Sequence, residues 1–354
     1  MNPGTTGYVE SLRRIRAGML ALVALVVTAL LVGARLAFAR GASAAVGSGV
    51  VVIDTNLGYQ GGQAAGTGMV LTSSGEVLTN NHVIAGATTI RVVVPATGRS
   101  YATRVVGYDV AADVAVLQLR GASNLATVST SSAKLSVGQP ITAVGNAGGT
   151  GRLVSVDGTI TGLRKTITAG DESGRSERLS GLIEIDAAVQ PGDSGGPLLD
   201  GNGRVIGMDT AASAGFGFGF RTTSTSDAYA IPIGRALPLA KQIEAGRSSA
   251  AVHVGPTAFL GVEVESVSDA YRYGDSGVSG ALIGGVVPGG PAASAGLVPG
   301  DVITAIGGRT VSSPASITAF VLARKPGARV AVGYVDQYGS RHTVSVTLGS
   351  GPPQ

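Results

Sequence analysis

Short apolar runs rich in β-branched residues recur along most of the chain. Three of them are Thr89–Val94, Ala115–Leu119 and Gly203–Met208. Runs of this length, bounded by Gly, Ser, Asn and Asp, are typical of strands, and helical periodicity is scarce. The 56 glycines among the 354 residues suit many tight turns. The pattern predicts a mostly β protein whose strands fit closed or sandwich-like barrels.

One segment has helical spacing instead. Apolar residues recur on one face of Leu237–Ala245, and Pro238 is tolerated in the first turn of a helix. We expect this helix to close a first domain, residues 45–245. The Gly-, Ser- and Ala-rich residues 246–255 are typical of a flexible linker to a second domain.

The N-terminus has the features of a targeting segment. Arg13, Arg14 and Arg16 precede an apolar run at 17–34, and small residues at 42–44 form a cleavage site. Residues 1–44 therefore predict a signal peptide, although about 18 mostly apolar residues are also nearly enough for an uncleaved signal anchor. Either way, we expect the rest of the chain to be exported, and to be secreted or associated with the cell envelope.

This targeting segment also explains the basic charge. Its five arginines and one glutamate account for the whole formal net charge of +4, so the remainder is near neutral and no nucleic-acid partner is expected. The chain has no cysteine, so its exported domains must be held together by core burial without disulfides. With three histidines and no His-Glu-x-x-His pattern, neither a metal nor an organic cofactor is expected.

A glycine-rich stretch at residues 145–151 has the composition of a phosphate-binding loop. No Gly-Lys-Ser/Thr follows it, and no helical pattern does either. We therefore expect a β-hairpin loop at this place.

Ser194 lies between glycines in Gly192–Pro197. Glycines on both sides let backbone N–H groups point at the place where an oxyanion would form, but such a hexapeptide alone is a weak signal. Two upstream segments strengthen it, since His82 lies in Thr-Asn-Asn-His-Val-Ile and Asp113 precedes the apolar run 114–117. The chain order His, Asp, Ser is that of the chymotrypsin-type triad.

The chemistry suggests a role for each of these residues. A serine hydroxyl is a poor nucleophile at neutral pH, so His82 would act as its base, and a buried carboxylate would fix the imidazole tautomer. Asp113 suits that position because the apolar run can bury it. Asp109 is the rival, but it follows an expected turn and is interpreted as a solvated loop residue. The other histidines, His253 and His342, are expected on the surface.

Together with residues 66–70 and 229–233, these segments resemble the HtrA/Deg-type trypsin-like serine proteases, above all the secreted PepA-type members of actinobacteria. The resemblance runs from about residue 50 to the end of the sequence. It implies a chymotrypsin-like pair of six-stranded antiparallel β-barrels, then a small PDZ-like domain at residues 256–350 and a tail at 351–354. Homotrimers are common in this family, so a homotrimer is compatible with the resemblance.

The resemblance also assigns the functional residues. The catalytic residues are expected to be His82, Asp113 and Ser194, and the oxyanion hole is expected to be formed by the backbone of Gly192, Asp193 and Ser194. Asp193 departs from the family pattern, in which asparagine usually precedes the nucleophile. In zymogen-activated relatives this aspartate pairs with a freshly cut N-terminal amine. No Ile-Val-Gly-Gly activation sequence occurs here, so we favour local backbone hydrogen bonds to Asp193.

A second signature lies at residues 285–303, which resemble the permuted bacterial PDZ pattern. The upstream residues resemble its carboxylate-binding loop, in which successive N–H groups bind a peptide C-terminus and the next strand pairs with the peptide. The expected peptide-binding residues are Phe259, Leu260, Gly261 and Val262. The alternative is that Phe259 and Leu260 are core residues of a small β-domain.

The primary specificity (S1) pocket is readable in part. In trypsin-like enzymes the residue six positions before the nucleophile lies at the base of this pocket. Here that residue is Ala188, and with Val189 it implies a small apolar pocket and cleavage after Val, Ala, Ile or Leu. Asp209 and Thr210 lie on the strand expected to form the pocket wall, and an offset there would let Asp209 admit a basic residue instead.

Two functions follow from these observations. We favour an exported serine endopeptidase of protein quality control that cleaves exposed segments of misfolded or specific envelope proteins through an acyl-enzyme, with the PDZ-like domain binding peptide C-termini. The alternative is a peptide-binding chaperone or scaffold with an idle protease domain. Alternating Phe and Gly at 214–220 would present aromatic side chains to unfolded chains if exposed. Membrane contact is expected only through an uncleaved N-terminal segment.

Overall fold

The computed structural model describes residues 47–170, 176–212, 228–267 and 278–354. The targeting segment at 1–44 and the Phe-Gly repeat at 214–220 lie outside these described residues. No helix among the described residues is long and apolar enough to cross a membrane. Residues Gly49–Gln354 belong to one unit of the fold.

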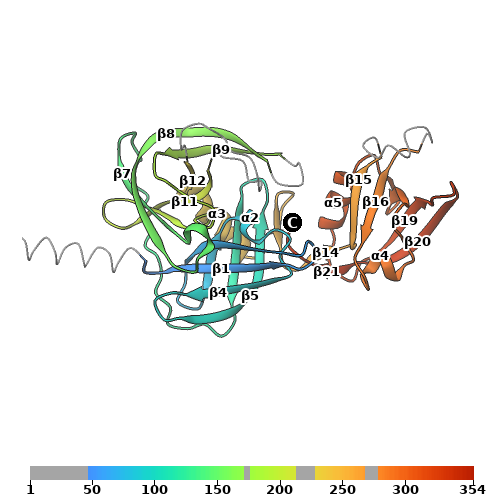
Figure 1. The fold of residues 1–354 in the computed structure, drawn as a ribbon, viewed down its shortest axis with the longest axis horizontal. Coiled ribbons are helices and arrows are strands. Elements are labelled where there is room, and N and C mark those ends of the chain that lie inside the picture. The colour runs from blue at the N-terminus through green and yellow to red at the C-terminus, as the bar shows by residue number, and fades with distance from the viewer. Residues whose placement is uncertain (1–46, 171–175, 213–227, 268–277) are drawn as a thin grey trace, which may run out of the picture. The chain divides into compact units, whose positions relative to one another are not determined.

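The first sheet is a ring of six antiparallel strands, coloured blue to blue-green in Figure 1, with a seventh strand from a later part of the chain added at β5. Its order is β13-β5-β4-β1-β2-β3-β6, and an additional pairing between β5 and β6 closes the ring. Alternating valines and isoleucines of β1 and β4 point inward, as expected for half-buried strands. The strands are β1 (Val50–Leu57), β2 (Gly62–Val70), β3 (Glu76–Thr79), β4 (Thr89–Val94), β5 (Arg99–Asp109), β6 (Val114–Leu119) and β13 (Val252–Val254).

The second sheet is a closed barrel of six strands in the order β10-β11-β12-β9-β8-β7. The loop at 145–151 joins β7 to β8, which pair antiparallel, so the predicted β-hairpin loop is confirmed. The two sheets together confirm the predicted chymotrypsin-like architecture. The strands are β7 (Pro140–Gly145), β8 (Val154–Gly170), β9 (Ser176–Ile185), β10 (Pro197–Leu199), β11 (Val205–Ala212) and β12 (Ala228–Pro232), and the loop contains the short 3-10 helix η1 (Ala147–Gly149).

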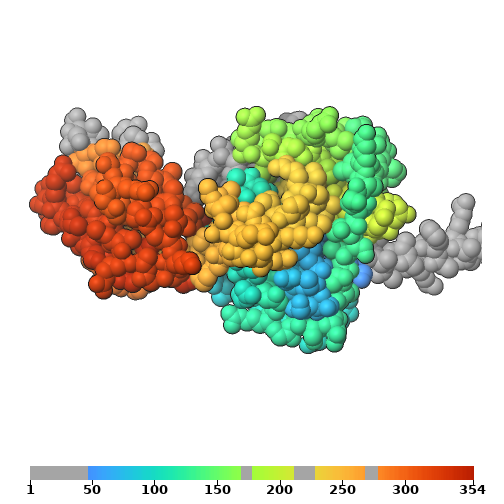
Figure 2. Space-filling view, turned by 180° about the vertical axis from the view of Figure 1, so that it is seen from behind, coloured from blue at the N-terminus to red at the C-terminus, as the bar shows by residue number. Residues whose placement is uncertain are grey.

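Helix α3 (Ile233–Glu244) packs against β11 of the closed barrel and against β5 and β6 of the first ring, and Figure 2 shows this part of the chain in gold on the outer surface. It begins at Ile233, so the prediction that it starts at Leu237 was wrong and Pro238 lies inside the helix. An interior proline destabilises a helix by about 3 kcal/mol. Burial of an apolar face offsets that cost and extends the helix upstream; its buried residues are Ile233, Ala236, Ala240 and Ile243.

Strand β13 lies inside the segment 246–255 that the composition indicated as a flexible linker. It pairs with β5, and the ring of His253 lies 5.0 Å from that of Tyr108. His253 is partly buried, so the expectation of a surface histidine was wrong, because a strand pairing distant in sequence covers it. His342 is exposed, as expected, and its Nε2 lies 2.8 Å from Asp336 Oδ2.

The C-terminal region has its own sheet of order β15-β16-β17-β19-β20, with β18 paired to β17, around a separate apolar core. Strand β15 pairs only with β16, so its other edge is open within the described residues. A two-stranded sheet joins β14 to β21. The elements are β14 (Thr257–Phe259), β15 (Val262–Ser266), β16 (Ala281–Val286), α4 (Pro291–Ser294), β17 (Val302–Ile306), β18 (Arg309–Thr310), α5 (Pro314–Leu322), β19 (Arg329–Val335), β20 (Arg341–Thr347) and β21 (Gly349–Gly351).

The start of α3 leads to a stability prediction at Gly234. This glycine is exposed in the first turn, and a Cβ there would meet no atom within 4 Å. We expect Gly234→Ala to raise the free energy of unfolding by about 0.5–1 kcal/mol in urea titrations, since alanine favours the helix. Gly195→Ala is the contrasting variant, because its φ is +86° and a Cβ would collide with the carbonyl of Thr67, and it should lose about 1–3 kcal/mol. No gain for Gly234→Ala would contradict a helix that begins at Ile233.

Candidate active site

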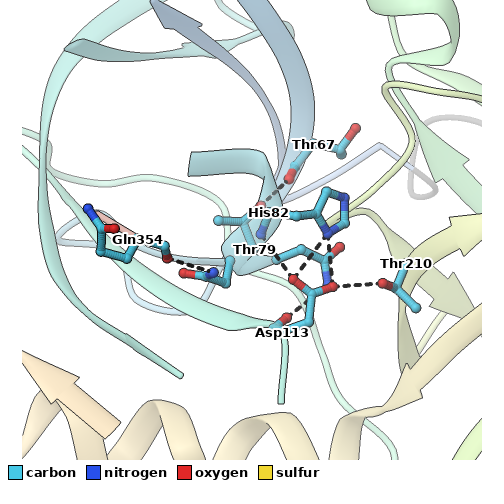
Figure 3. Close-up of polar contacts among 8 residues, drawn as sticks. Thr67, Thr79, His82, Asp113, Thr210 and Gln354 are labelled. Carbon is cyan, nitrogen blue, oxygen red and sulfur yellow. Dashed lines mark hydrogen bonds and ion pairs between the residues drawn. The ribbon is translucent and has the colours of Figure 1, made fainter. Parts of the chain in front are cut away.

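His82 lies on the short helix α2 (Asn81–Ile84), which follows β3 directly. Its ring nitrogen Nδ1 lies 2.9 Å from Asp113 Oδ2 and 3.1 Å from Asp113 Oδ1. Its backbone N–H also donates to Asp113 Oδ1, at 3.0 Å. One carboxylate therefore fixes both the ring and the backbone of His82, as Figure 3 shows.

Asp113 is the residue before β6, and its side chain is only 3% exposed. Its carboxylate accepts a third donor, the hydroxyl of Thr210, at 2.7 Å from Oδ2. Asn80 Nδ2 donates to its carbonyl oxygen at 3.0 Å. Asp113 has a φ of +53°, which is uncommon for a residue with a side chain, and these four contacts hold that conformation.

Asp109, the rival acid, is not a solvated loop residue. It is 4% exposed at the end of β5, and its Oδ1 accepts the N–H of Ala112 at 3.0 Å. Burial raises the pKa of its carboxyl group, and hydrogen bonds from Ala112 and Ala111 oppose the rise. The expectation was wrong because Asp109 closes the turn that delivers Asp113 to the site.

Ser194 lies in a buried turn that Thr67 of β2 holds on both sides. The N–H of Thr67 donates to the carbonyl of Ser194 at 2.9 Å, and its hydroxyl donates to the carbonyl of Gly192 at 2.7 Å. Thr79 Oγ1, three residues before His82, donates to the carbonyl of Thr67 at 2.7 Å. A chain of hydrogen bonds therefore joins the serine turn to the strand that leads to His82, and Figure 3 shows Thr67 and Thr79 of this chain beside His82.

A second route joins the same groups through β11. The N–H of Gly195 donates to the carbonyl of Asp209 at 2.9 Å, and the N–H of Asp209 donates to the carbonyl of Gly196 at 2.8 Å. The next residue is Thr210, whose hydroxyl binds Asp113. The turn that carries Ser194 is thus tied to the His82–Asp113 pair by two independent sets of contacts.

The three residues expected at the oxyanion hole differ in whether their backbone N–H groups already have a hydrogen-bond acceptor. The N–H of Asp193 donates to the carbonyl of Gln190 at 3.0 Å. Within the described part of the chain, the N–H groups of Gly192 and Ser194 donate to no protein acceptor. Gly192 has a φ of +99°, and a Cβ would collide with the carbonyl of Asn146, so only glycine fits this turn.

Two buried carboxyl groups belong to the serine turn and to the strand paired with it, Asp193 in the turn and Asp209 on β11. Asp193 Oδ2 accepts the backbone N–H of Gln190 at 2.8 Å, which is the local hydrogen bond favoured from the sequence. Neither carboxyl oxygen of Asp209 has a partner in the described structure, and the residue is fully buried. Burial first, and the charge of Asp193 second, raise the pKa of Asp209 well above its usual value.

The residues expected at the specificity pocket have different environments. Ala188 is exposed, Val189 is partly buried, and Asp209 and Thr210 are buried. Thr210 is engaged with Asp113, a role that the sequence analysis did not assign to it. Asp209 has no exposed surface from which its charge would meet a substrate.

The residues of the expected carboxylate-binding loop in the C-terminal region also have different environments. Leu260 is a core residue, 3% exposed, while Gly261 has a φ of +82° and Val262 begins the open-edged strand β15. The carbonyls of Leu260 and Gly261 accept backbone hydrogen bonds from Ala292 and Val287. The ring of Phe259 stacks on Tyr59 with centroids 5.3 Å apart.

Comparisons with known proteins identify the families of the two regions. The trypsin-like peptidase domain model matches residues 66–208, and the PDZ domain model matches residues 282–332. The chain is 35% identical to serine protease PepD of Mycobacterium tuberculosis, over 85% of this chain and 63% of that protein. It is 33% identical to periplasmic serine endoprotease DegP of Salmonella typhimurium, over 82% of this chain and 59% of that protein.

Among solved structures, the HtrA-type protease AlgW with a tripeptide is 28% identical and aligns over 89% of this chain and 98% of that chain, with a TM-score of 0.48. The chain spans about three fifths of the length of the curated relatives it matches. The family is the one that the three motifs and the PDZ pattern indicated. The chain belongs to the HtrA/Deg family of trypsin-like serine proteases that carry a PDZ domain.

Proposed function

We propose that this chain is a serine endopeptidase in which Ser194 is the nucleophile, His82 the general base and Asp113 the residue that orients His82. The observation that carries the proposal is the Asp113 carboxylate, which binds the ring and backbone of His82 and the hydroxyl of Thr210 at once. This arrangement selects the tautomer with the proton on Nδ1 and stabilises the imidazolium that forms during reaction.

These roles imply the following reaction. Ser194 Oγ attacks the carbonyl carbon of the scissile peptide bond and transfers its proton to His82 Nε2. The carbonyl oxygen becomes an oxyanion that accepts hydrogen bonds from the N–H groups of Gly192 and Ser194, each worth about 3–4 kcal/mol in such sites. His82 then protonates the leaving amine, the C–N bond breaks, and an ester forms on Ser194. Water, deprotonated by His82, hydrolyses that ester.

We infer that the substrates are exposed segments of misfolded or specific envelope proteins, met after export. The support for export is the targeting segment at 1–44 and the periplasmic relative DegP. The open edge of β15 suits β-augmentation by a peptide whose C-terminal carboxylate meets the loop from Phe259 to Val262. Protein quality control in the envelope is the role that fits these features.

We also propose a small apolar primary specificity pocket at Ala188 and Val189. No charge stands at Ala188, and the buried Asp209 presents no accessible carboxylate to a basic side chain. Burial that favours the neutral acid further weakens any attraction for lysine or arginine.

The first test of the function is labelling with a serine-directed fluorophosphonate. We expect the parent chain to be labelled and to cleave casein, because Ser194 is activated by His82. Ser194→Ala should abolish the label, and His82→Ala should lower the proteolytic rate by about 10⁴-fold or more. Ser131→Ala alters another buried serine and should keep full activity. A parent that takes no label would favour a chaperone or scaffold with an idle protease domain.

The pocket proposal is tested with peptide libraries that vary the residue before the cut. We expect kcat/KM for Val, Ala, Ile or Leu to exceed that for Arg or Lys by about 10²-fold or more, because an apolar pocket without an accessible charge leaves a cation unpaired. A preference for Arg would overturn the apolar pocket and would direct attention to Asp209.

The buried carboxyl of Asp209 predicts a pH dependence of stability. Its folded pKa is raised, so the folded state holds this proton more tightly than the unfolded chain does. The corresponding stability is present below about pH 4 and is lost as the pH rises, by up to about 1.4 kcal/mol per pH unit. Asp209→Asn should therefore be more stable than the parent at pH 7, and the difference should shrink towards pH 4 in urea titrations.

Asp186 provides a comparison of opposite sign. Hydrogen bonds from the backbone and hydroxyl of Thr159 lower the pKa of this exposed carboxyl, so its contribution is present at neutral pH and lost as the pH falls. Asp186→Asn should therefore lose stability at pH 7 relative to pH 3. If Asp209→Asn keeps the parent's pH slope between 4 and 7, another group is responsible for that slope.

A further inference from the structure

The last residues of the chain contact the helix that carries His82. Strand β21 ends at Gly351, and the next two residues, Pro352 and Pro353, are buried. The carbonyl of Pro353 accepts the N–H of Gly86 at 2.8 Å. The main-chain oxygen of Gln354 accepts Asn81 Nδ2 at 2.9 Å, which Figure 3 draws beside His82.

These two contacts lie at opposite ends of α2. Asn81 is the first residue of the helix and immediately precedes His82, while Gly86 lies two residues beyond its end. The helix has only four residues and no side-chain hydrogen bond at its N-cap. A single helical turn is unstable by itself, because its one or two hydrogen bonds do not offset the ordering of the backbone. Contacts from outside therefore determine how well α2 is ordered.

The C-terminal segment is itself anchored next to α2. Burial raises the pKa of the Tyr108 hydroxyl, and hydrogen bonds from Thr257 and from the backbone of Gln354 oppose the rise. Thr257 begins β14, the strand that pairs with β21, and its hydroxyl lies 3.2 Å from that of Tyr108. The two prolines restrict the backbone and lack N–H groups, so they present carbonyl acceptors in a fixed direction.

We propose that Pro352–Gln354 is a positioning segment for His82: by binding Asn81 and Gly86 it holds α2 in the register in which Nδ1 meets Asp113. This inference rests on the proposed function, since it names a group that acts through the catalytic histidine. Displacements of about 1 Å in a reacting group lower rates by about 10²-fold. The segment thus contributes to the rate of the acylation step without contacting substrate.

The test compares the parent with a chain that ends after Gly351, which keeps β21 and loses Pro352–Gln354. We expect kcat for a peptide substrate to fall about 10- to 100-fold with little change in KM. The rate constant for fluorophosphonate labelling of Ser194 should fall by the same factor. The synthetic peptide Gly-Ser-Gly-Pro-Pro-Gln, added in excess, should restore part of the rate. Ser350→Ala changes an exposed residue of β21 and should match the parent.

A point variant covers the case in which the shortened chain folds poorly. Asn81→Ala removes the donor to Gln354 and leaves the segment in place. We expect a several-fold fall in kcat at temperatures well below the unfolding midpoint, and a midpoint lower by only a few degrees because one partly buried hydrogen bond is lost. If both variants have the parent's kcat, calculated per site that takes the fluorophosphonate label, the proposal is overturned. A lower unfolding temperature of the shortened chain would then show only a structural role for the segment.

A readout independent of activity separates this inference from the proposed function. The chain has only three histidines, so the imidazole ¹⁵N resonances of His82 are readily assigned with a His82→Ala control. We expect the shortened chain to lose the signature of an Nδ1–H bonded to a carboxylate. An unlabelled parent would contradict the proposed function; unchanged His82 resonances in the shortened chain would overturn the inference alone.

Discussion

The site depends on one buried carboxylate. The Asp113 carboxylate binds the imidazole and the backbone N–H of His82, which lies on the helix after β3 of the first sheet. It also accepts the hydroxyl of Thr210, which belongs to the closed barrel. A buried carboxylate without donors is strongly disfavoured, so each of these contacts is needed, and together they fix the two sheets against each other at this place. The unusual φ of Asp113 is held by the same contacts. The geometry required for catalysis is therefore also the geometry that satisfies the buried charge.

A neutral counterpart joins the same sheets at the serine turn. Thr67 uses its N–H, its hydroxyl and its carbonyl to bind Ser194, Gly192 and Thr79. Its hydroxyl also accepts the N–H of Asn146, from the loop between β7 and β8. This one residue connects the first ring with the turn and with the hairpin loop, while the N–H groups of Gly192 and Ser194, the proposed oxyanion hole, donate to no acceptor among the described residues. Preorganised donors of this kind need no reorientation when charge develops.

Features set by short-range pattern could be predicted from the sequence. The run Thr89–Val94 is β4, the run 145–151 is a hairpin loop, and the apolar residues after Asp113 are β6, because alternation and turn residues determine them. Features set by contacts between distant segments could not. The burial of His253 follows from the pairing of β13 with β5, and nothing in residues 246–255 encodes that pairing.

The contrast between local pattern and long-range contact also explains which partners of the active-site residues the sequence did not predict. Thr67 and Ser194 are far apart in the sequence, and Gln354 contacts Asn81 across nearly the whole chain. Thr210 was named for the pocket wall, because a strand pattern tells which residues are in the strand but not which partner each side chain meets. Asp109 was misplaced for a related reason: a turn residue is usually solvated, and here the turn is packed because it delivers Asp113.

The buried acids Asp193 and Asp209 add the second electrostatic constraint at the serine turn. An ionised Asp209 would place a second negative charge close to that of Asp193, the residue before the proposed nucleophile. The two negative charges would repel each other, and in a low-dielectric interior the repulsion would be large. Burial without donors favours the neutral acid instead, so it removes this conflict. Asp113 and Asp209, near neighbours through Thr210, thus have opposite environments. The carboxylate of Asp113 accepts hydrogen bonds from the ring and backbone of His82 and from Thr210. The carboxyl of Asp209 accepts none within the described residues, and its burial raises its pKa.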